Sequence, residues 1–223
     1  MGKLVVIEGL DGSGKATQAA LLMDRLRGEG VETQELSFPR YDDDSSVLVR
    51  MYLGGEFGER PEDVNCYAAS VFYAADRYVS YKKHWERLYK GGALLVADRY
   101  VTSNAVFQMS KLKESEWDAY IGWLSDFEYG KLGIPKPDLV IYLDVDPIVS
   151  GRLLAGRYAA DAGTPDIHER DTAFQQRSRR AALYCSKAEA WKVIDCVKGG
   201  EIRKKDDIAR EVYEACGEVI NKA

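Results

Sequence analysis

A glycine-rich turn between an apolar strand and a helix constrains this chain most. Lys3 to Glu8 is a short, largely apolar run, and the segment at 9–15 that follows it, GLDGSGK, fits the pattern G-x-x-x-x-G-K. Gly14 to Arg27 then carries apolar residues at helical spacing. Glycines let backbone N–H groups turn inward around a phosphate, the helix adds its positive N-terminal end, and Lys15 adds a mobile charge. The turn predicts a nucleotide phosphate site; the alternative is an ordinary strand-to-helix turn with a surface lysine.

One position of this loop departs from the pattern. Ser or Thr usually follows the lysine and binds Mg²⁺, but the chain has Ala16, and the Thr17 hydroxyl sits about 100° further round the helix. We therefore expect Mg²⁺ to be held by carboxylates, with Asp98 and Asp11 as candidates, although Asp11 could also be a simple turn residue. The residues predicted to bind ATP are Gly9, Asp11, Gly12, Ser13, Gly14, Lys15, Ala16 and Thr17.

Strand and helix patterns alternate along the chain, which predicts a single α/β domain over residues 1–223 with a mostly parallel sheet. The segment Tyr158–His168 is rich in Ala, Gly, Pro and Asp and is predicted to be a loop. The expected strands are Lys3–Glu8, Glu32–Phe38, Ala93–Ala97, Asp138–Leu143 and Lys192–Cys196. The expected helices are Gly14–Arg27, Ser45–Leu53, Asp63–Tyr89, Ser115–Gly130, one starting at Ile148–Leu154, Thr172–Trp191 and Asp206–Asn221.

Composition excludes several functional classes. Hydrophobic residues make up 46% and charged residues 30% of the chain, as in globular proteins. The net charge of −5 argues against binding to nucleic acid or to an anionic membrane, and no apolar run approaches the roughly 20 residues that span a bilayer. The four cysteines are widely spaced and there are only two histidines, so we expect neither a disulfide framework nor a zinc site. Without a visible signal peptide, the chain is expected to be cytoplasmic.

A second group of polar residues follows the third predicted strand. Asp98 and Arg99 come directly after the apolar run Ala93–Ala97 and therefore lie at the carboxyl edge of the sheet, where doubly wound folds bind ligands. Asp98 is placed to hold a metal or its water, and Arg99 to hold a phosphate. A salt bridge at the strand end is the alternative interpretation.

Together, these segments resemble the thymidylate kinase family of P-loop nucleoside monophosphate kinases. Similar motifs continue through Phe38–Tyr41, Tyr73–Arg77 and His168–Asp171, so the resemblance covers roughly residues 3 to 197. It implies a three-layer fold with a five-stranded parallel sheet and a lid. It also implies transfer of the γ-phosphoryl group of ATP to dTMP, with Mg²⁺, in a homodimer formed through helices that flank the sheet. The residues that match the family signature after the third strand are Asp98, Arg99, Tyr100, Ser103, Asn104 and Phe107.

The resemblance also implies an acceptor site. Tyr73 and Arg77 lie four apart on one helix face, where they would stack on thymine and contact its O4, although Phe72 could stack instead of Tyr73. Asn104 would contact the base, and Phe107 would pack under the sugar and leave no room for a 2′-hydroxyl. The remaining residues predicted to bind dTMP are Asp11, Phe38, Arg40, Tyr41, Arg99, Ser103, Asp166, His168 and Glu169.

The stretch at about 152–170 resembles the family's lid, which excludes water and brings positive charge to the transferring phosphoryl group. Members of the family carry a basic residue either in the phosphate loop or in the lid. The loop position here is Gly12, so the lid is expected to supply the charge, with Arg157 as first candidate and Arg152 as second. His168 is expected to position the substrate rather than act as a base, because the acceptor is already an anion. The predicted catalytic residues are Lys15, Asp98, Arg99, Arg157 and Arg152.

Other functions are alternatives to this one. The nearest is a kinase that acts on another (deoxy)nucleotide or on a deoxynucleoside. A nucleotide-binding switch would need Asn-Lys-x-Asp, and the chain has Asn-Lys only at Asn221-Lys222. Ala16 alone would suggest a non-catalytic nucleotide-binding module.

Overall fold

Five parallel strands form the central sheet of the computed structural model, which describes residues 1–161 and 165–220. The strands are β1 (Lys3–Gly9), β2 (Thr33–Ser37), β3 (Leu94–Asp98), β4 (Leu139–Asp144) and β5 (Lys192–Asp195). Their spatial order is β2-β3-β1-β4-β5, and Val5 in β1 lies opposite Val96 on one side and Leu139 on the other. The central strands are apolar because both of their faces are covered. The predicted five-stranded parallel sheet is confirmed.

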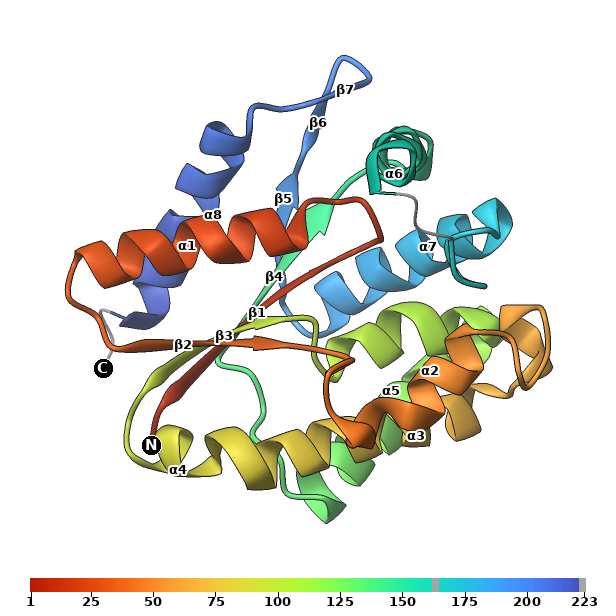
Figure 1. Ribbon diagram of the computed structural model, residues 1–223, viewed down its shortest axis with the longest axis horizontal. Helices are drawn as coiled ribbons and strands as arrows, with labels where there is room; N and C mark the ends of the chain where they lie inside the picture. Colours follow the sequence, from red (N-terminus) through yellow and green to blue (C-terminus); the bar gives the residue numbers. More distant parts are fainter. Residues whose placement is uncertain (162–164, 221–223) are drawn as a thin grey trace.

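Helices cover both faces of the sheet and complete the predicted three-layer architecture (Figure 1). Alternate residues of β1 belong to separate cores: Val5 and Ile7 pack with the first face, and Leu4 and Val6 with the second. The first face is covered by α1 (Lys15–Gly28) and α8 (Lys205–Ile220). The second face is covered by α3 (Cys66–Ser80), α4 (Glu86–Lys90), α5 (Trp117–Ser125) and α7 (Thr172–Ala188), while α2 (Val47–Leu53) packs on α3 and α6 (Pro147–Asp161) on α7.

The long helix predicted from Asp63 begins later than expected. Pro61–Asp63 forms a separate 3₁₀ turn, and α3 starts at Cys66 because the Asn65 side chain accepts a hydrogen bond from the Ala68 N–H, at 2.9 Å. The helix then continues through a π-helical turn at Tyr81–Trp85 into α4. This continuous rod places Tyr73 and Arg77 beneath the carboxyl edge of the sheet.

Three local features differ from the sequence-based expectation. Residues 158–161 are helical, so the predicted loop from Tyr158 was wrong over its first turn; the sequence there is alanine-rich, and alanine has the highest helix propensity. Two short helical turns, Asn104–Gln108 and Met109–Lys111, follow β3 and were not predicted. A hairpin of β6 (Val197–Lys198) and β7 (Glu201–Ile202) turns at two glycines with positive φ.

The sheet delivers the glycine-rich loop and the polar residues after β3 to one edge. Ile7 of β1 and Ser37 of β2 both lie opposite Asp98, the last residue of β3. The loop after β1 and the turn after β3 are therefore neighbours in space although about 90 residues apart in sequence. No helix within the described ranges is long and apolar enough to cross a membrane.

Candidate active site

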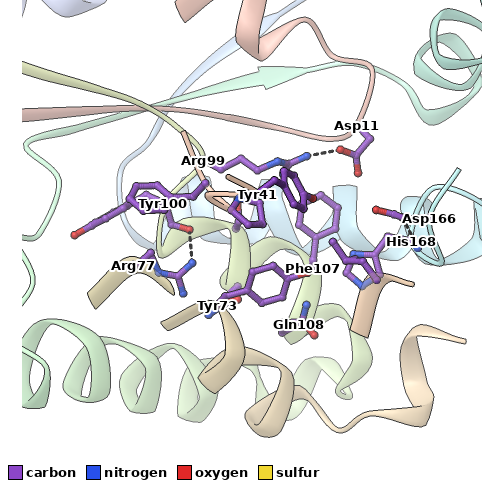
Figure 2. A pocket seen from close by; sticks show the side chains of 15 residues that line it. Asp11, Tyr41, Tyr73, Arg77, Arg99, Tyr100, Phe107, Gln108, Asp166 and His168 are labelled. Carbon is purple, nitrogen blue, oxygen red and sulfur yellow. Dashed lines mark hydrogen bonds and ion pairs between the residues drawn. The ribbon is translucent and has the colours of Figure 1, made fainter. Parts of the chain in front are cut away.

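A pocket lies at the carboxyl edge of β1, β2 and β3, with α3 below it (Figure 2). All residues predicted to bind the acceptor line it except Arg40 and Glu169, and Pro39, Leu53, Tyr100 and Gln108 join them. The lining residues are Asp11, Phe38, Pro39, Tyr41, Leu53, Tyr73, Arg77, Arg99, Tyr100, Ser103, Asn104, Phe107, Gln108, Asp166 and His168.

Close approach and backbone conformation explain the glycines of the loop. A Cβ on Gly9 would lie 2.5 Å from the Ser13 Oγ, and one on Gly12, whose φ is +76°, would lie 2.7 Å from the Ser150 carbonyl oxygen. Gly14 caps α1 with a φ of 86°. Ser13 is buried, and its Oγ has no hydrogen-bond partner among the described residues. The loop therefore curls as a phosphate-binding turn requires.

Lys15 folds back onto this loop. Its Nζ donates to the Leu10 carbonyl oxygen at 2.8 Å, and only 7% of the residue is exposed. Burial and the nearby Arg99 charge lower the pKa of Lys15 to about 8. Ala16 and Thr17 lie exposed on the first turn of α1. The ammonium group is thus held at the loop by a single carbonyl, which a phosphate oxygen could replace.

Arg99 connects the two sequence motifs. Its φ of 66° is strained for a residue with a side chain, and its guanidinium lies over the Phe107 ring, 5.0 Å from the ring centroid. It donates to the Asp11 Oδ1 and, at 3.4 Å, to the Gly9 carbonyl oxygen. Burial raises the pKa of Asp11, but the Arg99 and Lys15 charges outweigh it and leave that pKa below its usual value. Asp11 is therefore an ion-pair partner and more than a turn residue.

Sequence reasoning missed Glu8, which supports this arrangement. Its buried carboxylate accepts hydrogen bonds from the Thr102 and Ser103 hydroxyls, both at 2.8 Å, and lies 3.5 Å from the Arg99 guanidinium. An acidic residue at the end of an apolar strand, directly before the glycine loop, was the available signal. Close by, the Oδ1 of Asp98 is buried and has no hydrogen-bond partner in the part of the chain that the structure describes.

The opposite end of the pocket carries a fully paired charge. Arg77, 1% exposed, donates to both oxygens of Glu128, at 2.7 and 2.5 Å, and to the Tyr100 carbonyl oxygen at 3.3 Å. Burial lowers the pKa of Arg77, but Glu128 outweighs that effect and raises it. Asn104 donates through Nδ2 to Glu128 at 3.1 Å and to the Ser70 carbonyl oxygen at 3.3 Å, so its Oδ1 remains as an acceptor. Glu128 was not predicted.

Two of the predicted aromatic residues, Tyr73 and Phe107, form walls of the pocket, and Phe72 does not. Tyr73 lines the pocket, whereas Phe72 packs against Tyr52 and Phe57, with ring centroids 6.4 and 5.7 Å apart. Phe107 stacks on His168 at 5.7 Å with an interplanar angle of 16°. The pocket thus has Tyr73 on one wall and the Phe107–His168 pair on another.

Asp166 closes the pocket from the segment after α6. Its Oδ1 accepts hydrogen bonds from the backbone N–H groups of His168 and Glu169, at 2.8 and 2.9 Å. Burial and the Asp11 charge raise the pKa of Asp166 to about 7. Glu169 accepts from the Asp166 N–H at 3.1 Å and from the Tyr158 hydroxyl. Glu169 thereby fixes the turn that carries Asp166.

Two predicted arginines, Arg40 and Arg152, do not line the pocket. Arg40 pairs with Asp42 at 3.5 Å, and its Nε is buried without a partner. Arg152 is exposed and donates to the Gly200 carbonyl oxygen in the β6–β7 hairpin, at 3.2 Å. The side chain of Arg157 lies outside the described part of the structure. Their predicted roles remain predictions.

Comparison with known proteins adds a separate line of evidence. A family model described as thymidylate kinase matches residues 7–206. The chain is 34% identical over 191 residues to a thymidylate kinase of Mycobacterium tuberculosis; the matched region covers 84% of this chain and 87% of that protein. It is 29% identical over 211 residues to a Homo sapiens thymidylate kinase, which covers 92% of this chain and 87% of that protein. A solved structure of thymidylate kinase from Candida albicans has a TM-score of 0.67 at 22% identity, covering 99% and 92% of the two chains.

Proposed function

The chain belongs to the thymidylate kinase family, and we propose that the pocket at the sheet edge is where dTMP accepts the γ-phosphoryl group of ATP. The products are dTDP and ADP. One observation carries the assignment of the pocket. The Arg77–Glu128 pair and the Asn104 Oδ1 lie at one end, and the cations Arg99 and Lys15 lie at the other. A nucleoside monophosphate has the same arrangement, with a hydrogen-bonding base at one end, a phosphate at the other and a sugar between them.

The arrangement at Arg77 favours thymine and uracil. These rings present an N–H between two carbonyl oxygens. The Asn104 Oδ1 is an acceptor for that N–H, and Arg77 retains N–H groups beyond those bound to Glu128 and Tyr100 for a carbonyl. Cytosine presents an unprotonated ring nitrogen and an amino group at the same positions, so it would leave both protein groups unpaired.

The other end suits transfer between phosphates. In our proposal Lys15 and the loop N–H groups hold ATP, and Arg99 holds the phosphate of dTMP. The acceptor oxygen is already anionic, so no strong base is needed. The protein's contribution is to align the two phosphates and to neutralise charge as it develops.

The charges at this end fit a bound Mg²⁺. Glu8, Asp11 and Asp98 supply three carboxylates against the two cations Lys15 and Arg99, and two nucleotides would add further negative charge. No cluster of three His, Cys, Asp or Glu residues that could hold a metal occurs in the described part of the chain. Magnesium retains several waters and uses few protein ligands, so the unpartnered Oδ1 of Asp98 would accept one of its waters, with Asp11 as second candidate. When bound, the ion neutralises phosphate charge.

The lid arginines complete the proposal. Gly12 offers no side chain in the loop, so positive charge for the transferring group would come from Arg157 first and Arg152 second. Arg152 would have to leave the β6–β7 hairpin to do so. Single replacements by alanine distinguish them: the arginine that contacts the phosphoryl group should lower kcat, and the other should leave it nearly unchanged.

We also propose that the protein is a cytoplasmic homodimer. The outward face of α3 carries an apolar stripe at i, i+4 and i+11, formed by Tyr67 and Val71, each 43% exposed, and Tyr78, 39% exposed. Such a stripe favours burial against a second copy. The four cysteines are free thiols, which is typical of a reducing compartment. Sedimentation equilibrium, with Val71→Glu as the disrupting variant, tests the dimer.

A coupled ADP-release assay tests the activity. The unchanged protein is given ATP and Mg²⁺ with dTMP, dUMP, CMP, AMP or thymidine. We expect dTMP to be used best, dUMP less well, and CMP and AMP hardly at all. Preference for thymidine would identify a nucleoside kinase, and ADP release independent of any acceptor would contradict the proposal.

A further inference from the structure

A buried polar chain runs behind one wall of the pocket. The Nζ of Lys111 donates to the Tyr52 hydroxyl oxygen and to the Val64 carbonyl oxygen, both at 2.9 Å. The same hydroxyl lies 2.8 Å from the Nε2 of His168. His168 lines the pocket, whereas Lys111 and Tyr52 do not. These hydrogen bonds therefore link a residue of the pocket wall to a lysine that does not line the pocket.

Hydrogen-bond directions fix where the protons lie. An ammonium group can only donate, so the Tyr52 oxygen accepts from Lys111. The single Tyr52 proton then goes either to the His168 Nε2 at 2.8 Å or to the Pro61 carbonyl oxygen at 3.3 Å. A cation that donates to the hydroxyl oxygen makes its O–H a stronger donor and its oxygen a weaker acceptor. The shorter bond therefore runs from Tyr52 to an unprotonated Nε2.

The charge states agree with this direction. Burial and the Lys111 charge lower the pKa of His168 to about 3, so its ring stays neutral near pH 7. Burial raises the pKa of Tyr52 well above 10, so its hydroxyl keeps its proton. Burial lowers the pKa of Lys111 only to about 8, which leaves the cation predominant. A neutral ring whose Nε2 accepts must carry its proton on Nδ1.

Packing holds the imidazole in place. It stacks on Phe107, meets Tyr52 edge-on at 5.4 Å between ring centroids, and contacts Phe174 at 4.8 Å. Among the described residues, the hydrogen bonding of the ring is confined to Nε2, and Nδ1 makes none. The Nδ1–H is therefore a fixed donor without a protein acceptor, in a ring that lines the pocket.

We propose that Lys111 and Tyr52 are positioning residues: they hold His168 as the Nδ1–H tautomer, which donates to the 3′-hydroxyl of the bound nucleotide. In Figure 2, Phe107 lies between Arg77 at the base end and Asp11 at the phosphate end, and His168, which stacks on Phe107, lies beyond it, below Asp11. The 3′-hydroxyl is the only hydroxyl of dTMP, and it lies between base and phosphate. The location of the sugar rests on the proposed function; the tautomer rests on the protein alone.

Imidazole nitrogen NMR tests the tautomer without any substrate. His84 and His168 are the only histidines, so labelling histidine with ¹⁵N gives two ring systems, and His84→Gln assigns them. We expect protonated Nδ1 and unprotonated Nε2 for His168. Tyr52→Phe and Lys111→Met should each convert this single tautomer to a mixture. Lys113→Met removes an exposed lysine two residues away and should change nothing. A protonated Nε2 in the unchanged protein, or tautomers insensitive to Tyr52→Phe, would overturn the proposal.

Steady-state kinetics test the link to the sugar. Tyr52→Phe should raise KM for dTMP about twofold to fivefold, because only the Nδ1–H fraction of the tautomer mixture can donate, with kcat nearly unchanged. With 2′,3′-dideoxythymidine monophosphate as acceptor, Tyr52→Phe and the unchanged protein should have the same KM. Equal losses with both acceptors would show a merely structural role and overturn the inference. Should Lys111→Met fail to fold, Tyr52→Phe alone decides. Lack of dTMP kinase activity in the unchanged protein would instead refute the proposed function, while the NMR result would stand.

Discussion

The two ends of the pocket use charge in opposite ways. At the Arg77 end, one cation meets one carboxylate, Glu128, through two hydrogen bonds, and Asn104 occupies the same carboxylate. At the Lys15 end, three carboxylates act on two cations. Among the residues that the structure describes, the lysine bonds only to a loop carbonyl and an oxygen of Asp98 has no partner. The first end is complete within the protein, and the second is not.

Under the proposed function, this difference separates recognition from reaction. A base contact must discriminate between rings, so its groups should be fixed beforehand, and the buried Arg77–Glu128 pair would meet that requirement. Phosphates and their metal change charge during transfer, so the groups around them must exchange partners. In our proposal, Lys15 and Asp98 exchange theirs, and Arg99, whose φ of 66° is strained, lies at the same end.

The largest effect should come from breaking the completed end. Glu128→Ala leaves the Arg77 guanidinium buried without its anion, which typically costs about 3–5 kcal/mol. Urea unfolding should show a loss of that size, together with a strongly raised KM for dTMP. Removal of both partners, in Arg77→Ala with Glu128→Ala, should destabilise less than the sum of the single changes. A small stability loss in Glu128→Ala would show that this end is not preorganised by the pair.

Lys15→Ala should have the next largest effect, on catalysis rather than stability. A lost charge on the transferring phosphates is worth about 3–4 kcal/mol of barrier, or 10²- to 10³-fold in kcat. Within the described ranges the ammonium bonds only to the Leu10 carbonyl oxygen, so the free energy of unfolding should change little. Single-turnover assays and urea unfolding on the same samples provide the comparison. Near-full turnover by Lys15→Ala would refute the phosphate-loop assignment.

The sequence predicts the Lys15 end of the pocket better than the Arg77 end. The loop at 9–15 and the Asp98–Arg99 pair are contiguous motifs, because strand-to-helix turns at one sheet edge bring their own residues together. Glu128 lies 51 residues from Arg77 on a separate π-helical turn, and no local pattern links the two. Lys111, Tyr52 and His168 are far apart in the sequence, and only the packing of the folded chain brings them within hydrogen-bond distance. Such long-range polar pairs depend on how helices dock, which periodicity does not specify.

Magnesium dependence should respond more moderately. Asp98→Asn weakens an acceptor for a metal-bound water, so the Mg²⁺ concentration for half-maximal rate should rise about tenfold. Ala16→Ser should lower that concentration only slightly, because phosphate oxygens, waters and carboxylates already satisfy the metal. A large gain from Ala16→Ser without any effect of Asp98→Asn would place the metal at the loop hydroxyl position instead.

The smallest predicted effect concerns the pH dependence of stability. With a pKa of about 7 in the folded protein and about 4 in the unfolded chain, Asp166 keeps a proton between these values only when folded. The folded state binds more protons there, so this carboxyl makes stability fall as pH rises from about 4 to 7. His168, with its pKa lowered to about 3, acts in the opposite direction between about pH 3 and 6.5 and masks the trend in the unchanged protein.

Comparison with Asp166→Asn removes that masking, because both proteins retain His168. Between pH 5 and 8 these pKa values correspond to at most about 2.7 kcal/mol, and solvent screening of the half-buried carboxyl reduces this to about 1 kcal/mol. The variant should therefore gain about 2–4 °C in Tm relative to the unchanged protein as pH rises over this range. Asp42→Asn, at a carboxyl whose side chain is 79% exposed, serves as the control and should show no such trend. A Tm difference between Asp166→Asn and the unchanged protein that stays constant with pH would mean that Asp166 is already ionised at pH 5. The Lys15 end would then carry one more negative charge than it does with a protonated Asp166. Its need for a divalent cation would be correspondingly stronger.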